Sequence, residues 1–255
     1  MTGGRGSPAI EARRLYKTFG ALSVADGIDF TLRYGARHAV IGPNGAGKTT
    51  FINLLTGVLS PNSGSITLDE MDITHLGQAG RVKRGLTRTF QINTLFRRLS
   101  VLDNVRLAVS EAQGVTWNML RPAASRSDVA DRAYQLLQNL DLASDAHCPV
   151  ETLAYGRQRM VEIAIALALE PKVLLLDEPA AGIPSDETHR ISDMIESLSP
   201  HIAVLIVEHD MSLVFRLAKR ITVLVQGKVF LEGSPEEIGE NPAVRKIYLG
   251  ERFAH

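Results

Sequence analysis

The chain has 255 residues, and its 28 basic residues (Lys and Arg) balance its 28 acidic residues (Asp and Glu), so the formal net charge is zero. This balance gives no general electrostatic reason to expect a nucleic-acid partner, and we predict none. The single cysteine, Cys148, excludes an internal disulfide. No apolar run reaches the roughly 20 residues of a membrane span, so work at a membrane requires a partner.

The N-terminal part of the sequence predicts a short leader followed by strands, turns and one helix. Residues 1–8 contain no apolar segment and predict a disordered leader rather than a signal peptide. Residues 28–32 alternate like a strand, and residues 38–41 form a short apolar strand directly before a glycine-rich loop. Residues 48–59 then show apolar side chains at helical spacing, and residues 60–64 predict a turn.

The middle of the chain, residues 91–158, predicts helices. Residues 101–109 and 128–140 both carry apolar side chains at intervals of three and four residues. A polar and less regular stretch separates these two segments. The middle region is therefore expected to form a helical layer of its own.

The last part of the sequence alternates apolar strands with helices. Residues 173–176 and 203–207 are continuous apolar runs, which are typical of strands covered on both faces. Residues 185–198 and 212–219 predict helices that follow these strands. Alternation of strands and helices predicts an α/β fold with a mainly parallel sheet.

A glycine-rich loop joins the strand at residues 38–41 to the helix at residues 48–59. It matches the pattern G-x-x-x-x-G-K-[ST] through Gly42, Pro43, Asn44, Gly45, Ala46, Gly47, Lys48 and Thr49, and Thr50 follows. Glycines let backbone amides turn toward a phosphate, and the helix adds the positive end of its dipole. Lys48 is expected to reach the β- and γ-phosphates, and the Thr49 hydroxyl to coordinate Mg²⁺. A glycine turn that binds nothing is the alternative, and the strand–loop–helix context argues against it.

Two carboxylates, Asp177 and Glu178, follow directly after the apolar strand at residues 173–176. Asp177 is expected to hold the Mg²⁺ shell, and Glu178 to orient or deprotonate the water that attacks the γ-phosphate. Two surface acids at the end of a strand are the alternative interpretation. The phosphate loop in the same chain favours ATP hydrolysis over that alternative.

These motifs, with further residues in the same order, resemble the nucleotide-binding subunits of ATP-binding cassette (ABC) proteins. The resemblance covers residues 9–250. Phe19 resembles the aromatic residue that stacks on adenine, although Tyr16 offers a second planar face. Gln91 resembles the glutamine that joins the two lobes and approaches Mg²⁺ and the attacking water. His209 resembles the switch histidine that contacts the γ-phosphate.

The segment at residues 153–158 lies where the family has its signature, Leu-Ser-Gly-Gly-Gln, and departs from that pattern. Ala154 replaces the serine, Tyr155 the first glycine and Arg157 the glutamine, whereas Gly156 remains. The resemblance implies that these four residues close the ATP site of a partner cassette, with help from the amides of the following helix. Whether the Arg157 side chain replaces the lost serine contact is left open by the sequence.

The resemblance also implies the architecture of a P-loop cassette. A core of residues 9–90 and 159–235 would hold a mainly parallel sheet with an antiparallel edge, residues 91–158 a helical subdomain, and residues 235–255 a helical tail. Two cassettes would pack head to tail around ATP and Mg²⁺, and hydrolysis would loosen the dimer. Pro184 replaces the aspartate that usually ends the loop after the carboxylates, which implies altered coupling between the sites or a group supplied by the partner.

Several segments resemble one branch of the family, the ATP-binding subunits of branched-chain amino acid importers: Arg88–Gln91, Leu95–Arg97, Leu153–Gly156, Pro179–Gly182 and Asn241–Gly250. This resemblance implies a second ATPase subunit, identical or different, together with two membrane permeases and, indirectly, a periplasmic solute-binding protein. It implies a peripheral protein at the cytoplasmic face of a bacterial inner membrane. The ATPase would energise uptake of branched-chain amino acids or a related small polar solute.

Other functions stay open at this point. Residues 96–100 and 247–251 also resemble the ATPases of lipopolysaccharide or lipid export. A soluble, non-transport cassette protein of translation or DNA repair is disfavoured by the single phosphate loop, and a regulator without turnover would need a silent Glu178. A basic stretch flanking Gln91 either contacts a permease or membrane head groups, or is a solvated face; it comprises Arg81, Lys83, Arg84, Arg88, Arg97 and Arg98.

Overall fold

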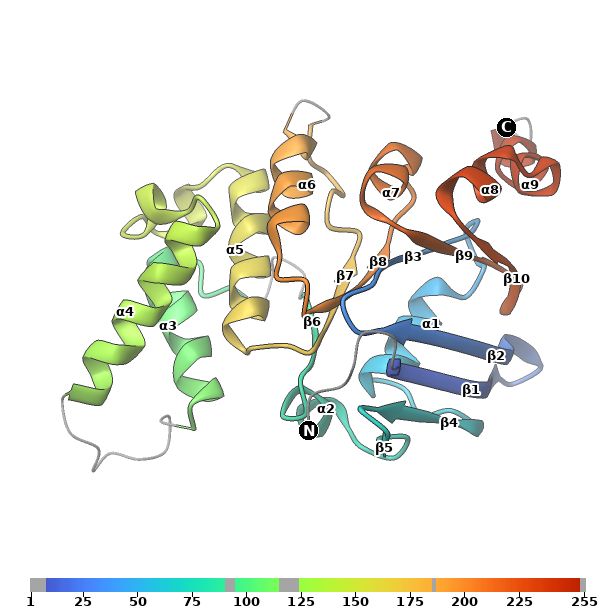
Figure 1. Cartoon of the computed structure of the whole chain (residues 1–255), viewed down its shortest axis with the longest axis horizontal. Coiled ribbons are helices and arrows are strands. Elements are labelled where there is room, and N and C mark those ends of the chain that lie inside the picture. The colour runs from blue at the N-terminus through green and yellow to red at the C-terminus, as the bar shows by residue number, and fades with distance from the viewer. Residues whose placement is uncertain (1–7, 90–94, 115–123, 185–186, 253–255) are drawn as a thin grey trace. The chain divides into compact units, whose positions relative to one another are not determined.

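The computed structural model describes residues 8–89, 95–114, 124–184 and 187–252, and for residues 124–127 and 248–252 it describes the backbone alone (Figure 1). The chain divides into two compact units. We call residues 1–86, 172–178 and 199–255 the core unit, and residues 87–171 and 179–198 the helical unit. Of the expected leader, only Pro8 lies among the described residues, and it begins the first strand.

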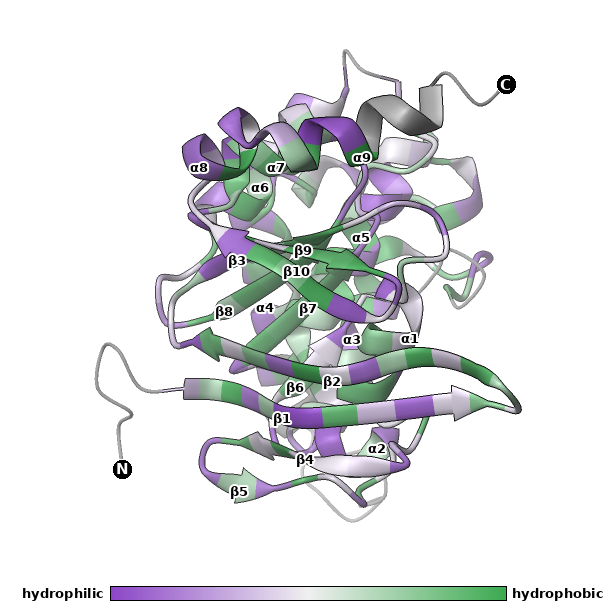
Figure 2. Ribbon diagram, turned by 90° about the vertical axis from the view of Figure 1, so that its right-hand side faces the viewer, coloured by the Kyte–Doolittle hydropathy of each residue, from purple (hydrophilic) through white to green (hydrophobic). Residues whose placement is uncertain are grey.

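The core unit is built on a six-stranded sheet. Its strands, in spatial order, are β10 (Lys228–Gly233), β9 (Arg220–Val225), β3 (Arg37–Ile41), β8 (Ala203–Val207), β7 (Val173–Asp177) and β6 (Leu86–Arg88). Strands β9, β3, β8 and β7 run parallel, and β10 pairs antiparallel with β9. All of β8 and nearly all of β7 are buried, and Figure 2 shows the apolar residues of both strands in green. The division between the two units falls within β6. The prediction of an α/β fold with a mainly parallel sheet and an antiparallel edge is confirmed.

A second, antiparallel sheet belongs to the same unit. It is formed, in spatial order, by β2 (Leu22–Arg33), β1 (Pro8–Phe19), β4 (Ser63–Leu68) and β5 (Met71–Asp72). The sequence predicted only residues 28–32 of β2, because buried and exposed side chains do not alternate in its first half. Register shifts between β1 and β2 explain this irregularity, since each shift moves the following side chains to the other face.

The helices of the core unit are α1 (Lys48–Thr56), α2 (Gln78–Val82), α7 (Met211–Leu217), α8 (Pro235–Glu240) and α9 (Pro242–Arg252). Helix α1 ends before the predicted residue 59, because Gly57 takes a left-handed conformation (φ 76°) and its amide bonds to the Leu54 carbonyl. Buried side chains of α1 form one apolar core with residues of both sheets, and Phe51 meets Phe30 of β2 edge to face. Helix α8 begins with a reciprocal capping box between Ser234 and Glu237.

Arg81 lies in this core and not on the basic surface that the sequence suggested. Its side chain is only 1% exposed, and its guanidinium donates to four carbonyl oxygens, those of Leu54, Leu55, Thr74 and Leu76. Two of these carbonyls belong to the last turn of α1, which leaves its C-terminal carbonyls without helical partners. Burial lowers the pKa of Arg81 to about 10, so the guanidinium stays charged at neutral pH. Arg81 therefore fixes the end of the helix that begins at the glycine-rich loop.

His38 lies in a second buried polar network of the core unit. Its Nε2 is 2.8 Å from the Thr222 hydroxyl, which donates to the Glu232 carboxylate at 2.9 Å. Because that hydroxyl proton is used toward Glu232, the Thr222 oxygen accepts the proton of His38 Nε2. Arg220 pairs with the same carboxylate, and the Phe30 ring lies 4.9 Å from the imidazole. Burial lowers the pKa of His38 to about 4, against the opposing effect of Glu232.

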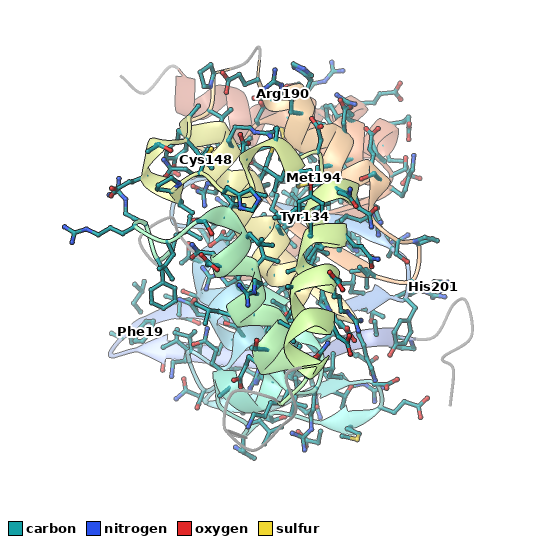
Figure 3. The ribbon with its side chains drawn as sticks, turned by 90° about the vertical axis from the view of Figure 1, so that its left-hand side faces the viewer. Phe19, Tyr134, Cys148, Arg190, Met194 and His201 are labelled. Atoms are coloured by element: carbon teal, nitrogen blue, oxygen red, sulfur yellow. The ribbon has the colours of Figure 1, made fainter. Side chains whose placement is uncertain are left out.

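The helical unit contains α3 (Val101–Ala112), α4 (Ala124–Asn139), α5 (Tyr155–Ala168) and α6 (Thr188–Ser197), with short 3-10 turns η2 (Ala143–Asp145) and η3 (Val150–Thr152). Helices α3, α4 and α5 contact one another, and α6 contacts α5 (Figure 1). Figure 3 shows Tyr134 on α4 and Met194 on α6. Among the described residues, no helix is both long enough and apolar enough to cross a bilayer.

Helix α5 is buried on most of its surface and contains an ion pair. The Arg159 guanidinium donates to Glu162 Oε2 at 2.7 Å, and the Glu162 side chain is 2% exposed. Burial raises the pKa of Glu162 to about 7, because it outweighs the stabilising contact with Arg159. Glu162 therefore takes up a proton more readily in the folded chain than in the unfolded chain.

We expect the two buried groups to affect stability in opposite directions with pH. The unfolded chain protonates His38 near pH 6.5 and the folded chain only near pH 4, so this group lowers stability as pH falls between those values. At pH 5 the loss is on the order of 2 kcal/mol relative to pH 7.5. Glu162 has the opposite effect: its protonation increases the stability of the folded chain as pH falls from about 7.

The test compares the wild-type protein with His38→Gln, which retains a donor toward Thr222. Urea unfolding at pH 7.5 and pH 5.0 measures the change in unfolding free energy of each protein. The wild-type protein is expected to lose about 2 kcal/mol more than the variant over this interval, because the two proteins differ only in His38 and the contribution of Glu162 is common to both. Equal losses in both proteins contradict the assignment of a buried, neutral His38.

Candidate functional site

The glycine-rich loop lies between β3 and α1, with Thr49 and Thr50 in the first turn of the helix. Gly47, the N-cap of α1, has a left-handed conformation (φ 99°). A Cβ on Gly47 would lie 2.6 Å from the Val24 carbonyl oxygen, so a larger residue would displace the backbone. The loop thus presents the start of a helix, where an anion is favoured.

Lys48 folds back over this loop. Its ammonium donates to the carbonyl oxygens of Gly42 at 2.5 Å and Pro43 at 3.0 Å. These carbonyls hold the cation beside the amides at the start of α1. A phosphate entering the loop meets both the positive charge and the helix terminus.

The turn between β9 and β10 supports the loop from its other side. The Gly227 amide donates to the Ala46 carbonyl at 2.9 Å, and the Asp26 amide of β2 donates to the Gly227 carbonyl at 2.8 Å. Gln226 (φ 48°) and Gly227 (φ 76°) both have positive φ, as a tight hairpin turn requires. The sequence analysis missed this support, and the Gln-Gly pair between two apolar runs was its only local signal.

The two carboxylates stand at the end of β7. Asp177 is the last residue of the strand, and Glu178 follows in a left-handed conformation (φ 48°) that is uncommon for a residue with a side chain. The Glu178 amide donates to the Val207 carbonyl of β8 at 2.8 Å, which holds this unusual backbone. The Glu178 side chain is 50% exposed and therefore accessible to water.

His209 follows β8 and points toward the same region. Its Nδ1 lies 4.0 Å from Glu178 Oε1 and 3.7 Å from Glu208 Oε2. The buried Glu208 carboxylate accepts from the backbone amides of His209 and Asp210, at 3.0 and 3.4 Å. Glu208 thus shapes the turn that presents His209, a role that the sequence analysis did not assign.

Strand pairing explains why these distant segments come together. Val207 of β8 is the register partner of both Val40 in β3 and Asp177 in β7. The three strands are parallel neighbours, so their carboxyl ends meet at one edge of the sheet, where ligands bind in open α/β folds. The phosphate loop, the two carboxylates and His209 all follow those strand ends.

The signature segment belongs to the helical unit. Ala154 is the N-cap of α5 and has no side-chain oxygen to accept from the helix, and the Gln158 amide makes the first helical bond, to the Ala154 carbonyl. The amides of Tyr155, Gly156 and Arg157 therefore lie in the first turn, before that bond. Such a turn presents partial positive charge to an anion.

The two remaining predicted residues lie apart from the strand ends. Phe19 stands at the tip of the hairpin formed by β1 and β2, where Figure 3 labels it, and its side chain is 50% exposed. The Lys17 ammonium lies 5.5 Å from its ring centroid, and Tyr16 is also partly exposed. An exposed aromatic face is available for stacking on a base. Gln91 lies outside the described residues.

Comparison with known families shows to which family this chain belongs. A family model described as ABC transporter matches residues 25–181, which include the phosphate loop, the signature segment and the carboxylates. The chain belongs to the ABC transporter family. A second model, described as branched-chain amino acid ATP-binding cassette transporter, matches residues 228–254 of this ABC cassette.

Individual relatives resemble the cassette over almost its whole length. The high-affinity branched-chain amino acid transport ATP-binding protein LivG of Salmonella typhimurium is 39% identical, over 96% of this chain and 98% of LivG. The lipopolysaccharide export system ATP-binding protein LptB of Acidithiobacillus ferridurans is 36% identical, over 97% and 99%. A crystal structure of the ADP conformation of an ATP-binding cassette of an ABC transporter superposes with a TM-score of 0.83, at 27% identity, covering 96% and 99%.

Arg157 of the cassette uses its side chain inside the helical unit. Its Nε donates to Asp145 Oδ2 at 2.7 Å, and a terminal nitrogen donates to the Asp141 carbonyl at 2.7 Å. The side chain is 16% exposed. These contacts tie the start of α5 to the turn after α4, so Arg157 offers an anion its backbone amide and not its guanidinium.

The oxygen donors of the cassette fit a magnesium ion that arrives with a nucleotide. Thr49 offers a hydroxyl and Asp177 a carboxylate, and Mg²⁺ commonly takes one or two protein oxygens together with phosphates and waters. Within the described ranges, no group of three or more His, Cys, Asp or Glu side chains could hold a metal ion by itself. The donor set therefore suits a nucleotide-bound Mg²⁺ better than a separate metal cage.

Proposed function

We propose that the chain is the ATP-hydrolysing, nucleotide-binding subunit of an ABC importer. The observation that carries the proposal is the register of β8 with β3 and β7, which gathers the phosphate loop, two carboxylates and a histidine at one sheet edge. ATP hydrolysis needs a phosphate cradle, a metal ligand and a group that activates water, and these segments offer all three. Residues 9–250 would form the ATP-binding domain.

In this proposal the core unit binds and cleaves the nucleotide. The loop amides and Lys48 bind the β- and γ-phosphates, and Phe19 stacks on adenine. Thr49, Asp177 and Gln91 hold Mg²⁺, which neutralises charge that develops on the phosphates. Glu178 orients or deprotonates the attacking water, and His209 contacts the γ-phosphate.

The helical unit would complete the site of a second cassette packed head to tail. The first turn of α5, from Ala154 to Arg157, would approach the phosphates that the partner cassette holds. ATP would then join the two cassettes, and loss of the γ-phosphate would separate them. The partner is a second ATPase subunit, either an identical chain or a different one.

The matches at the C-terminus and along the chain support an importer of branched-chain amino acids or a related small polar solute. The cassette would work at the cytoplasmic face of a bacterial inner membrane, beneath two permease subunits. A periplasmic protein would capture the solute. Nothing in the cassette is proposed to touch that solute.

A second candidate, lipopolysaccharide or lipid export, has support from the 36% identity to LptB. The hypothesis of an importer has more support, because the sequence identity to LivG is higher and a branched-chain amino acid family model matches the C-terminal residues. Affinity purification of the tagged chain in mild detergent, followed by mass spectrometry, separates the two. Two multi-span permeases and a second cassette support import, whereas outer-membrane lipid-transport components support export.

The proposed role of Glu178 predicts a specific loss of turnover. Glu178→Gln keeps the size of the side chain but removes the base, so ATP hydrolysis by the purified complex is expected to fall about 100-fold or more. ATP binding is expected to persist, and size-exclusion chromatography should show an ATP-dependent association of cassettes. A variant that hydrolyses ATP at the wild-type rate contradicts the general-base role.

A further inference from the structure

The segment that follows the carboxylates packs on the first turn of α5 within the helical unit. The Tyr155 ring covers Gly182, with ring atoms 3.3 to 3.5 Å from the position of a Cβ on that glycine. A Cβ on Gly156 would lie 3.7 Å from Ile183 Cγ2 and 2.9 Å from Glu187 Oε2. The Glu187 carboxylate therefore lies directly beside Gly156.

This carboxylate is beside the terminus that has no side-chain cap of its own. Ala154, the N-cap residue, offers no oxygen to the helix, and Gly156 is the second residue of α5. A negative charge near the start of a helix is favoured by the helix dipole. Glu187 comes from the N-cap position of α6, so the contact joins the beginnings of two helices.

Two arginines at the start of α5 have partners of their own. Arg157 pairs with Asp145 and with the Asp141 backbone, and Arg159 pairs with Glu162. The Arg159 guanidinium also lies 5.9 Å from the centroid of the Tyr155 ring. Among the described residues, Glu187 is the charged side chain that lies within 4 Å of the position of a Cβ on Gly156.

We propose that the Glu187 carboxylate lowers the affinity of the signature turn for the nucleotide phosphate held by the paired cassette. This inference rests on the proposed function, in which that turn approaches the phosphate. Phosphate and carboxylate carry like charges and compete for the same helix terminus, so closure of the cassettes requires Glu187 to leave Gly156. Its side chain, being flexible, can move without backbone rearrangement.

The size of the effect follows from the strength of such interactions. A single charge at an exposed helix terminus changes an equilibrium roughly two- to five-fold. Glu187→Gln removes the charge and keeps the shape of the side chain, so the KM for ATP is expected to fall by that factor. Because the interaction is between charges, raising the salt concentration should shrink the difference between the two proteins.

The experiment measures ATPase rate against ATP concentration for the complex that co-purifies with the tagged chain, at low and high salt. Glu196→Gln is the matched control, since Glu196 is an exposed carboxylate on α6 and its loss changes the net charge equally. We expect a lower KM for Glu187→Gln only, with kcat changed less than KM. An unchanged or higher KM overturns the inference.

Thermal unfolding of the same proteins separates this proposal from a purely structural role. Loss of a favourable charge at the start of a helix lowers the stability of the protein slightly. If Glu187 had only this structural role, its replacement would raise KM or lower kcat. A lower KM in a slightly less stable protein is therefore specific to competition with phosphate. If the wild-type complex does not hydrolyse ATP, the proposed function fails, and this result is distinct from an unshifted KM in an active complex.

Discussion

Replacing Lys48 with alanine is expected to abolish ATP turnover and to weaken ATP binding on the order of 100-fold, as loss of a charged contact to phosphate predicts. The ammonium lies over the glycine-rich loop, bonded to the carbonyls of Gly42 and Pro43. Without it, the phosphates meet those carbonyl oxygens with no intervening cation. Titration with a fluorescent ATP analogue measures the affinity, and phosphate release measures turnover.

Lys83→Ala is the control for this change, because Lys83 is an exposed lysine of the same unit and its removal alters the net charge equally. It should bind ATP like the wild-type protein. Thermal unfolding of Lys48→Ala without nucleotide checks that the loop still folds. ATP binding by Lys48→Ala at wild-type affinity would remove the basis for a phosphate site in this loop.

Replacing Arg81 with methionine is expected to cost on the order of 3–5 kcal/mol of unfolding free energy. Methionine fills part of the volume but removes the guanidinium donor from the carbonyls of Leu54, Leu55, Thr74 and Leu76 in a buried site, of which the Leu54 carbonyl still accepts from the Gly57 amide. For a chain of this size, the loss corresponds to a melting temperature lower by roughly 10 °C. Differential scanning calorimetry without nucleotide measures it.

Arg84→Met is the matched control for Arg81. It removes a guanidinium one turn away whose described hydrogen bond is a 3.4 Å contact to the Gly80 carbonyl at the surface. Its melting temperature should change by about 1 °C or less, as is usual for exposed positions. Equal effects of the two substitutions would show that the four buried bonds to Arg81 add nothing to stability.

The chemistry of the candidate site could be predicted from the sequence because its motifs are local. The glycines, Lys48 and Thr49 lie within one loop, and Asp177 and Glu178 end one apolar run. Each carries a physical reason that requires no knowledge of the fold. The parallel sheet follows from the apolar runs and the helices between them.

Features that depend on distant contacts could not be predicted in this way. Arg81 looks no different in sequence from Lys83 and Arg84, yet it is buried because its carbonyl acceptors come from α1 and a separate loop. The side chain of Arg157 took its partners from residues 141 and 145, a pairing with no signal at the signature itself. Glu187 likewise meets Gly156 only through tertiary packing.

The shared register of Val207 has a consequence for how this site tolerates change. Main-chain hydrogen bonds of β8 align it with β3 on one side and β7 on the other. Replacing one buried apolar side chain of β8 with another of similar size therefore keeps the carboxyl ends of the three strands in register. A one-residue deletion within β8 is different, since it shifts His209 by about 3.3 Å against both the loop and the carboxylates. The site therefore tolerates many apolar substitutions in β8, but it does not tolerate a change in the number of residues in that strand.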